Sequence, residues 1–208
     1  MWTAAILAGG RARRFGGRDK SGLVLAGRTI LDRQLAELRP LAARILLVCG
    51  PRLPVSPPPG VAVVKDRVHG AGVLGAIYTA LLESATPLTA VVGCDMPFVS
   101  GRFLAHLAEA AGDADVVLPR TRDGYEPLCA IYARRAAASI LRRLDAGALK
   151  VADLVGTLRV REIGPDEIAP YDPDGTLFLN VNAPDDYRRA LAWANRTGPS
   201  PGQPIASE

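Results

Sequence analysis

Residues 6–20, with the sequence ILAGGRARRFGGRDK, bring bare backbone and positive charge together directly after an apolar run. Gly9 and Gly10 have no Cβ, so the chain can turn sharply there and present backbone N–H groups to an anion. Arg14 adds a planar fork of donors that suits phosphate oxygens, and Lys20 adds a compact positive charge. These residue types predict a phosphate-binding loop; the alternative is a turn with a solvated basic face.

This stretch differs from two common nucleotide-binding motifs. A P-loop has glycine directly before its lysine, whereas Lys20 follows Asp19. The dinucleotide-binding pattern G-x-G-x-x-G also fails, because Arg11 stands two residues after Gly9. A nucleotide at this loop would therefore be held by another kind of glycine-rich turn.

A single carboxylate, Asp95, follows the uncharged run 88–93 and precedes Met96-Pro97. A carboxylate at the carboxyl end of a strand can hold Mg²⁺, which bridges phosphate oxygens and offsets their charge in phosphoryl transfer. The alternative is a turn residue whose side chain bonds the backbone before the next helix. We expect Asp95 to be a metal ligand.

Two amides, Asn180 and Asn182, alternate in the segment FLNVN. In a strand both would face one side. Asparagine is depleted in strands, so two on one face indicate amides recruited for binding rather than packing. For Asn182 the alternative is capping of the helix that starts near Pro184.

Helices and strands must position these groups. Along the chain, continuous apolar runs alternate with segments whose apolar residues recur at helical spacing. Continuous apolar runs predict buried strands, and apolar residues at helical spacing predict helices. Alternation of the two predicts an α/β fold with a mostly parallel central sheet and helices on both faces. Ligands of such sheets bind outside the carboxyl ends of the strands. The predicted strands are 2–8, 44–49, 61–64, 88–93, 115–118, 126–133, 158–163 and 176–179, and the predicted helices 29–41, 73–85, 101–111, 134–146 and 183–195.

Length and composition limit the possible classes. The 208 residues predict a single domain, 1–196, and a Pro/Gly-rich, disordered tail, 197–208. No apolar run is long enough for a membrane span, and no signal peptide is evident, so we expect a cytoplasmic protein without a membrane partner. Three scattered cysteines predict free thiols, and two histidines exclude a histidine-rich metal site. With a net charge of +4 and 5% aromatic residues, no basic, aromatic-rich stretch indicates nucleic-acid binding.

Four segments, taken in order, resemble the molybdenum cofactor guanylyltransferases, which belong to a broader nucleotidyltransferase group. The loop reads LAGG-x3-R-F-GG-x-DK, as in that family. The other three segments are VVGCDMPFVS at 91–100, EPLCAIYARR at 126–135 and FLNVNAPDDYRRAL at 178–191. Together they extend over nearly the whole chain, which makes the combination far more specific than any one segment.

The resemblance implies roles for individual residues. Arg14, Lys20 and Asp95 would be catalytic, with Asp95 as the Mg²⁺ ligand. Gly17, Asn180 and Asn182 would face the acceptor, molybdopterin. For Asp66 a surface salt bridge to Lys65 or Arg67 remains the alternative. The nucleotide would be bound by Leu7, Ala8, Gly9, Gly10, Lys20, Asp66 and Asp95.

The implied reaction joins GMP from GTP to the terminal phosphate of molybdopterin and releases pyrophosphate. In related enzymes LAGG accompanies GTP and LAAG accompanies CTP, so Gly10 favours guanine. The alternatives are a CTP-dependent cofactor cytidylyltransferase, a sugar-phosphate nucleotidyltransferase, and a delivery protein that binds nucleotide or cofactor without catalysis. Transient contact with molybdoenzymes or cofactor chaperones is also expected. One departure from the family is Cys49, where the second strand often ends in asparagine.

Overall fold

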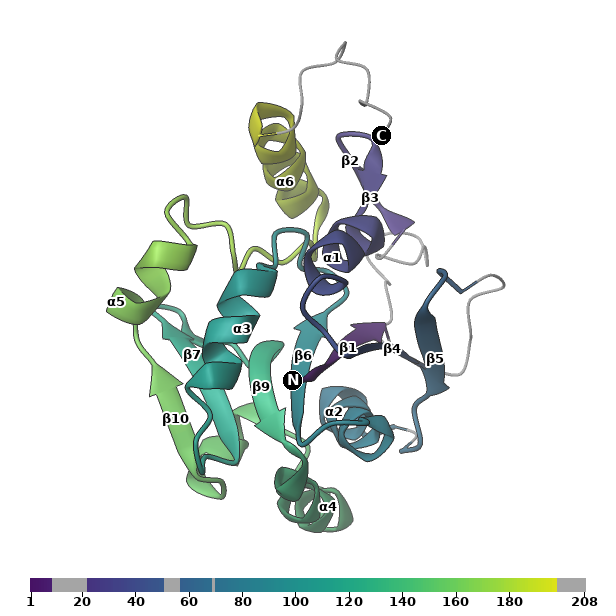
Figure 1. The fold of residues 1–208 in the computed structure, drawn as a ribbon, viewed down its shortest axis with the longest axis vertical. Helices are drawn as coiled ribbons and strands as arrows, with labels where there is room; N and C mark the ends of the chain where they lie inside the picture. The colour runs from purple at the N-terminus through teal and green to yellow at the C-terminus, as the bar shows by residue number, and fades with distance from the viewer. Residues whose placement is uncertain (9–21, 51–56, 69, 198–208) are drawn as a thin grey trace.

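The computed structural model describes residues 1–8, 22–50, 57–68 and 70–197 of the chain (Figure 1). A central sheet has the strand order β10-β7-β9-β6-β1-β4-β5. Neighbouring strands are parallel except β9, which is antiparallel to β6 and β7; short β8 also pairs antiparallel with β7. The predicted mostly parallel sheet is confirmed. The strands are β1 (Thr3–Ala8), β4 (Arg44–Cys49), β5 (Val61–Lys65), β6 (Leu88–Gly93), β7 (Val116–Thr121), β8 (Gly124–Tyr125), β9 (Cys129–Ala133) and β10 (Val160–Ile163).

Helices cover both faces of this sheet, as the sequence predicts. α1 (Ile30–Leu38), α3 (Gly101–Glu109) and the short α5 (Pro165–Ile168) pack on the front face in the view of Figure 1. α2 (Gly72–Glu83) and α4 (Ala137–Asp145) pack on the rear face. Because both faces are covered, the central strands are apolar throughout, as in the buried run of β1.

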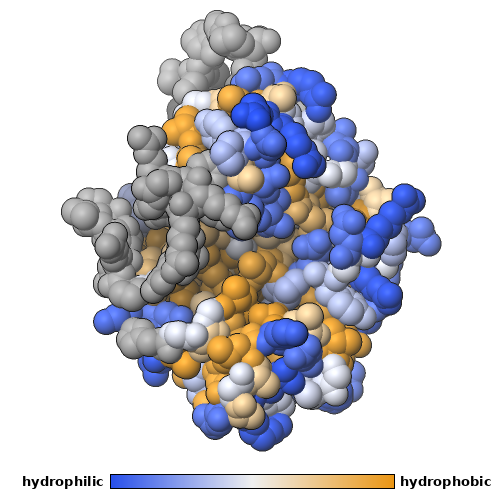
Figure 2. All heavy atoms as spheres, turned by 180° about the vertical axis from the view of Figure 1, so that it is seen from behind, coloured by the Kyte–Doolittle hydropathy of each residue, from blue (hydrophilic) through white to orange (hydrophobic). Residues whose placement is uncertain are grey.

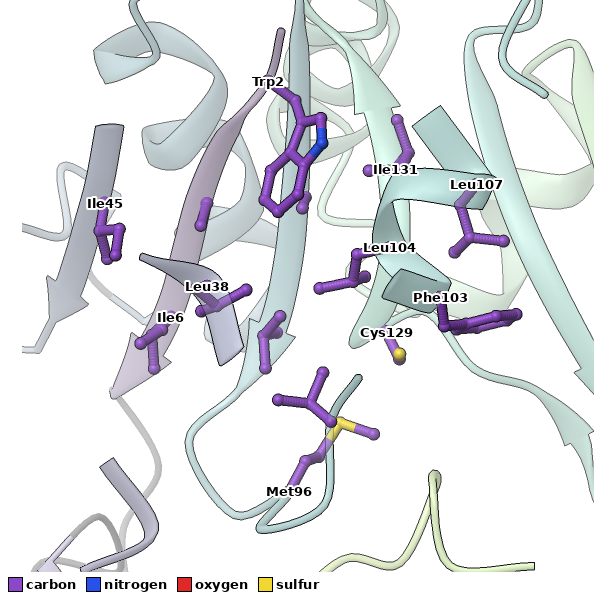
Figure 3. Close-up of a cluster of buried hydrophobic side chains, with 14 of the residues drawn as sticks. Trp2, Ile6, Leu38, Ile45, Met96, Phe103, Leu104, Leu107, Cys129 and Ile131 are labelled. Carbon is purple, nitrogen blue, oxygen red and sulfur yellow. The ribbon is translucent and has the colours of Figure 1, made fainter. Parts of the chain in front are cut away.

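The front core is anchored by large side chains from the sheet and from α1 and α3. Trp2, Leu38 and Phe103 are fully or almost fully buried there, and Figure 3 shows them among the side chains that fill the space between the sheet and the helices. Met96, from the turn after β6, belongs to the same cluster and is fully buried. The front core therefore holds not only the helices but also the turn that presents Asp95.

A smaller third cluster lies beyond the carboxyl edge of the sheet. It joins the hairpin β2 (Val24–Leu25) and β3 (Arg28–Thr29) to α6 (Pro184–Thr197) through buried Leu25 and Ala190. The hairpin turns at Ala26 and Gly27, both with positive φ. The hairpin is not predicted from the sequence, because Asn-Gly or Asp-Gly is the usual signal for such a turn and Ala-Gly is not.

One strand prediction was wrong, and another began three residues too early. Residues 176–179 form a turn: the Asp172 carboxylate accepts hydrogen bonds from the backbone N–H groups of Thr176 (2.7 Å) and Leu177 (3.0 Å), and Leu179 N–H bonds Thr176 O. These local bonds take donors that a sheet partner would need. The predicted strand 126–133 starts only at Cys129, because residues 126–128 turn back from β8.

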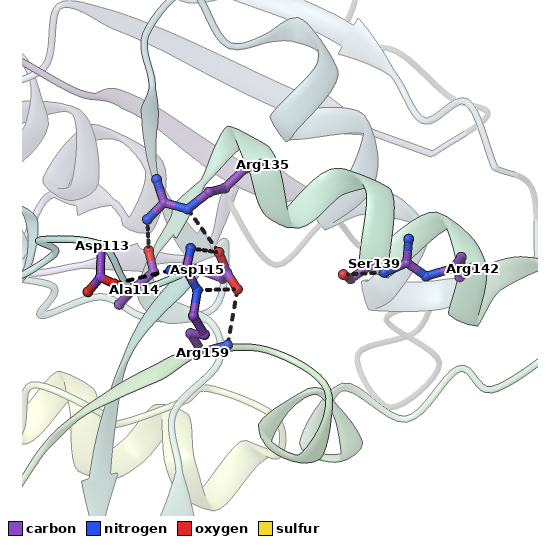
Figure 4. Close-up of polar contacts among 7 residues, drawn as sticks. All are labelled: Asp113, Ala114, Asp115, Arg135, Ser139, Arg142 and Arg159. Atoms are coloured by element: carbon purple, nitrogen blue, oxygen red, sulfur yellow. Dashed lines mark hydrogen bonds and ion pairs between the residues drawn. The ribbon is translucent and has the colours of Figure 1, made fainter.

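The opposite edge of the sheet carries an ion-pair network (Figure 4). Asp115, directly before β7, accepts hydrogen bonds from the guanidinium groups of Arg159 and Arg135. The bond from Arg159 is the main reason that the pKa of Asp115 is lowered to about 2. This network fastens β7 to the segment leading into β10 and lies at the amino ends of the parallel strands, away from the carboxyl edge.

Among the helices of the described residues, none combines the length and the apolar character that crossing a membrane requires.

Candidate active site

The parallel strands bring the predicted site residues to one edge of the sheet. β1 ends at Leu7 and Ala8, which pair in register with Gly93 of β6 on one side and Cys49 of β4 on the other. Asp95 lies two residues after the end of β6. The predicted residues Gly9, Gly10, Arg14, Gly17 and Lys20 lie outside the described residues.

Asp95 sits half-buried on a tight turn whose backbone is bonded on several sides. Met96 N–H donates to Gly93 O (3.2 Å), and Cys94 N–H donates to Leu7 O (3.3 Å), which fastens the turn to β1. A Cβ added to Gly93 would lie 2.9 Å from Asp95 Oδ1. Glycine at this position therefore leaves the space that the carboxylate occupies.

Gln34, on α1, holds the Asp95 turn by two hydrogen bonds from its side chain. This residue was not among those predicted from the sequence. Its side chain is fully buried, and Nε2 donates to the carbonyl oxygens of Gly93 (2.7 Å) and Met96 (2.9 Å), on either side of Asp95. The available signal was a polar residue on the apolar face of a helix, between buried Ile30 and Leu38. Such a residue needs a buried partner.

The segment with the two asparagines lies beside the Asp95 turn. Val181, between Asn180 and Asn182, donates its backbone N–H to Asp95 O (2.8 Å). The prediction that these residues form a strand was wrong; Asn180 Nδ2 donates to Phe178 O (3.1 Å). The structure thus brings the predicted acceptor-side segment into contact with the predicted metal ligand.

The start of α6 is fixed by an acidic side chain. Asp186 Oδ2 accepts hydrogen bonds from the backbone N–H groups of Asn182 (3.0 Å) and Ala183 (2.8 Å). These donors precede the first turn of α6, where no intrahelical acceptor is available. Asp186 therefore fixes the backbone on which Asn182 stands.

Asp66 lies at the same edge but three strands away from β6. Its N–H donates to Cys49 O (2.7 Å), and its Oδ1 accepts from Thr79 Oγ1 (2.9 Å) and Val68 N–H (3.1 Å). Arg67, one of the predicted salt-bridge partners, pairs with Glu83 instead. The backbone of Cys49 thus helps to position Asp66 at the end of β5.

Glu126 is a further carboxyl group near this edge, in the segment that leads from β8 to β9. Burial raises its pKa to about 7, with a smaller contribution in the same direction from Asp123 and an opposing hydrogen bond from Thr121. Two residues on, Leu128 O accepts from Gly93 N–H (2.9 Å), so this segment borders the Asp95 turn. A perturbed carboxyl in such a place is a candidate functional group that the sequence pattern did not reveal.

The fold and the site together define a class of protein. A mostly parallel α/β sheet that gathers backbone turns and carboxylates at the carboxyl ends of its strands is an arrangement in which such proteins bind nucleotides. The chain belongs to the MobA-like NTP transferase family, whose domain matches residues 4–160.

Individual relatives agree with this assignment. The molybdenum cofactor guanylyltransferase of Desulfosudis oleivorans is 32% identical over 191 residues, covering 91% of this chain and 94% of its own. A relative from Chloroflexus aggregans is 33% identical over 208 residues, covering 95% and 97%. The crystal structure of molybdopterin-guanine dinucleotide biosynthesis protein A from Archaeoglobus fulgidus matches with a TM-score of 0.79 and 28% identity, covering 94% of this chain and 100% of that one.

Proposed function

We propose that this protein transfers GMP from GTP to the terminal phosphate of molybdopterin or molybdenum cofactor, giving the guanine dinucleotide form and pyrophosphate. The observation that carries the proposal is the backbone hydrogen bond from Val181 to Asp95, which joins the acceptor-side segment to the carboxylate turn at the end of β6. The names of the Desulfosudis and Archaeoglobus relatives support the same reaction.

The reaction joins two anions, so the site must offset their repulsion and align them. Arg14 and Lys20 would supply positive charge to the phosphates, and the amides of Gly9 and Gly10 would cradle them. The acceptor phosphate is already ionised at neutral pH, and it attacks the α-phosphorus of GTP while pyrophosphate leaves. No covalent enzyme intermediate and no strong general base are required.

Other residues would hold the two substrates on either side of the reacting phosphates. Leu7, Ala8 and Asp66 would bind the nucleotide over β1 and β5. Gly17, Asn180 and Asn182 would bind the acceptor, with Asn180 and Asn182 held close to Asp95 by the bond from the residue between them.

The donor set at Asp95 fits Mg²⁺. The described residues include no group of three or more His, Cys, Asp or Glu that could hold a metal ion, so Asp95 would act without a protein cage. Mg²⁺ is usually bound by one or two carboxylates together with substrate phosphates and water, which suits a single carboxylate on a fixed turn. When bound, Mg²⁺ would offset charge on the phosphate oxygens. Asp95 would hold it, and Gln34 would hold Asp95.

Nucleotide choice is the finer part of the proposal. Gly10 would leave space near the base for a purine where alanine would crowd it, which favours GTP over CTP. The reaction would take place in the cytoplasm, in keeping with three buried cysteines. The product would pass to molybdoenzymes or cofactor chaperones by transient contact.

The experiment is pyrophosphate release by purified protein with Mg²⁺ and molybdopterin, offering GTP, CTP, ATP and UTP separately. Wild type is compared with Asp95→Ala and Lys20→Ala, and exposed Asp145→Ala serves as the matched control. We expect release with GTP alone, loss in the first two variants and normal release in the control. A preference for CTP would refute the role of Gly10, and tight GTP binding without release from any nucleotide would identify a delivery protein.

A further inference from the structure

A crevice of about 350 Å³ lies against the rear side of β7 and β9. Its lining includes Leu118 and Tyr132 from the sheet, Tyr125 and Pro127 from the segment between β7 and β9, and Val151, Ala152 and Leu154 from the 3-10 helix Val151–Gly156. Four residues of this lining, Val116, Leu118, Tyr132 and Leu154, belong to the rear core cluster, and Figure 2 shows that apolar side chains gather on the rear side of the molecule. The volume lies in the range of small-molecule sites.

The crevice adjoins the Asp95 turn. Pro127 lines it, and the next residue, Leu128, accepts the hydrogen bond from Gly93 N–H (2.9 Å) and lies against the space beside Gly93. Pro127 and Leu128 therefore connect the lining of the crevice to the end of β6. An elongated molecule whose phosphate reached Asp95 could therefore place its other end in the crevice.

The lining determines what that other end can be. The hydroxyl of Tyr125 already donates to Glu162 (2.8 Å), and that of Tyr132 to Pro127 O (3.1 Å). The two hydroxyl groups are thus engaged, so the rings contribute mainly apolar atoms to the lining. Asp123 is the only acidic or basic residue among the lining residues, and it is exposed.

The Asp123 carboxylate repels a phosphate but accepts hydrogen bonds. Two adjacent N–H groups of a ligand can donate to both oxygens of the carboxylate. The 2-amino-4-oxopyrimidine edge of a pterin carries such neighbouring donors, and its ring faces suit flat apolar walls. A sugar, by contrast, would find few polar partners in this lining.

We propose that this crevice binds the pterin ring of the acceptor, with Asp123 accepting hydrogen bonds from the amino-substituted edge of the ring. The proposal rests on the acceptor being the phosphorylated pterin of the proposed function. In this arrangement β7, β8 and the 3-10 helix determine which acceptor is bound, and the phosphate of the acceptor lies at the Asp95 turn.

Guanine carries the same 2-amino-oxo edge, so GTP is a second possible source of this chemistry. The position of the crevice favours the acceptor. It lies on β7 and β9, on the far side of β6 from Ala8 and Asp66, which the proposed function assigns to the nucleotide. Measuring the KM of GTP and the KM of the acceptor separately shows which of the two molecules binds in the crevice.

The test compares wild type with three variants. Ala152→Phe fills the crevice from an exposed lining position, and Asp123→Asn removes the carboxylate. Ala138→Phe, at an exposed position of α4 outside the crevice, is the matched control. Each is assayed for KM of GTP, KM of molybdopterin and kcat. Binding of free pterin, and of lumazine, which has an oxo group in place of the 2-amino group, is titrated by fluorescence without nucleotide.

Filling the crevice should raise the acceptor KM by roughly tenfold or more, the scale of a blocked apolar contact. The GTP KM and kcat should stay within about twofold, because the other site is untouched. Asp123→Asn should weaken pterin binding by roughly fivefold and lumazine binding far less, since it removes a charged acceptor.

Three results would overturn the subsite: an unchanged acceptor KM in Ala152→Phe, an equal change in Ala138→Phe, or a rise confined to the KM of GTP. If wild type released no pyrophosphate from any nucleotide, the proposed function would fail by itself. The pterin titration would then decide the subsite, and pterin binding that Ala152→Phe left unchanged would refute it.

Discussion

Replacing Gln34 with leucine removes the two hydrogen bonds that hold the backbone on either side of Asp95. The carbonyl oxygen of Met96 then loses its bond from Gln34 inside the core, at about 2 kcal/mol. The carbonyl oxygen of Gly93 keeps the bond from Met96 N–H, so its loss is about 1 kcal/mol. Gln34 Oε1 is itself buried without a partner among the described residues, and its removal returns about 2 kcal/mol. We expect Gln34→Leu to lower the free energy of unfolding by about 1 kcal/mol, measured by urea denaturation.

The effect on catalysis should exceed what this loss of stability explains. A reacting group displaced by about 1 Å can cost roughly a hundredfold in rate, so a loosened Asp95 turn should lower kcat by roughly tenfold or more. The half-saturating Mg²⁺ concentration should rise as well, because the carboxylate is no longer held in place. Pyrophosphate release is measured against Mg²⁺ at a temperature where the variant remains folded.

Thr89→Val is the matched control for Gln34→Leu. Thr89 is also fully buried, and its hydroxyl has no hydrogen-bond partner within the described part of the chain. It lies at the other end of β6, so this change should leave kcat and the Mg²⁺ dependence intact. If Gln34→Leu lost the expected stability but kept both kinetic values, Gln34 would be a packing residue and the positioning argument would be wrong.

Three further changes test the site and the fold. Gly93→Ala places a Cβ 2.9 Å from Asp95 Oδ1, so pyrophosphate release should fall roughly tenfold or more while urea unfolding changes little. The arginine hydrogen bonds that lower the pKa of Asp115 to about 2 stabilise the fold fully above pH 4 and less as pH falls toward 2; Asp115→Asn should flatten that part of an acid-unfolding curve. Burial raises the pKa of Glu126 to about 7, so the fold loses stability as pH rises from about 4.5 through 7, and Glu126→Gln should remove this loss in urea titrations.

For each of these three changes, one result would contradict the expectation. Gly164→Ala, where an added Cβ meets no atom within 4 Å, should leave activity unchanged, and an equal loss there would show that Gly93 has no special role. An Asp115→Asn curve parallel to wild type below pH 4 would mean that its ion pairs contribute nothing. For Glu126, equal pH slopes in the variant and wild type would show that the carboxyl is solvated.

The sequence predicted those helices and strands whose patterns depend only on residues close together in the chain. β4 and β6 occur at the predicted residues, because a continuous apolar run between polar or glycine boundaries depends only on neighbours. The rule that ligands bind at the carboxyl ends of parallel strands also placed Asp66 and Asp95 at one edge. The failures at 126–128 and 176–179 occurred where side chains and turns bond backbone donors that propensity assigns to a sheet.

What could not be predicted is the set of contacts between distant segments that makes the site rigid. Gln34 reaches the Asp95 turn across the front layer, and Val181 reaches it from beyond the carboxyl edge. Neither contact leaves a periodic signal, because each depends on how helices pack after the sheet forms. A buried glutamine on an apolar helix face indicates a partner but does not say which.

These long-range contacts also explain how one fold can hold two anionic substrates in register. The hairpin β2–β3 and α6 share a buried cluster, and Tyr187 of α6 donates its hydroxyl hydrogen bond to Val24 O (2.7 Å). Val181 belongs to that cluster and at the same time bonds Asp95 O. A shift of α6 would therefore move the acceptor-side asparagines and the metal-binding turn together, because one buried residue ties both to the same support. The alignment of the two substrates thus depends on packing beyond the sheet as much as on the residues that contact them.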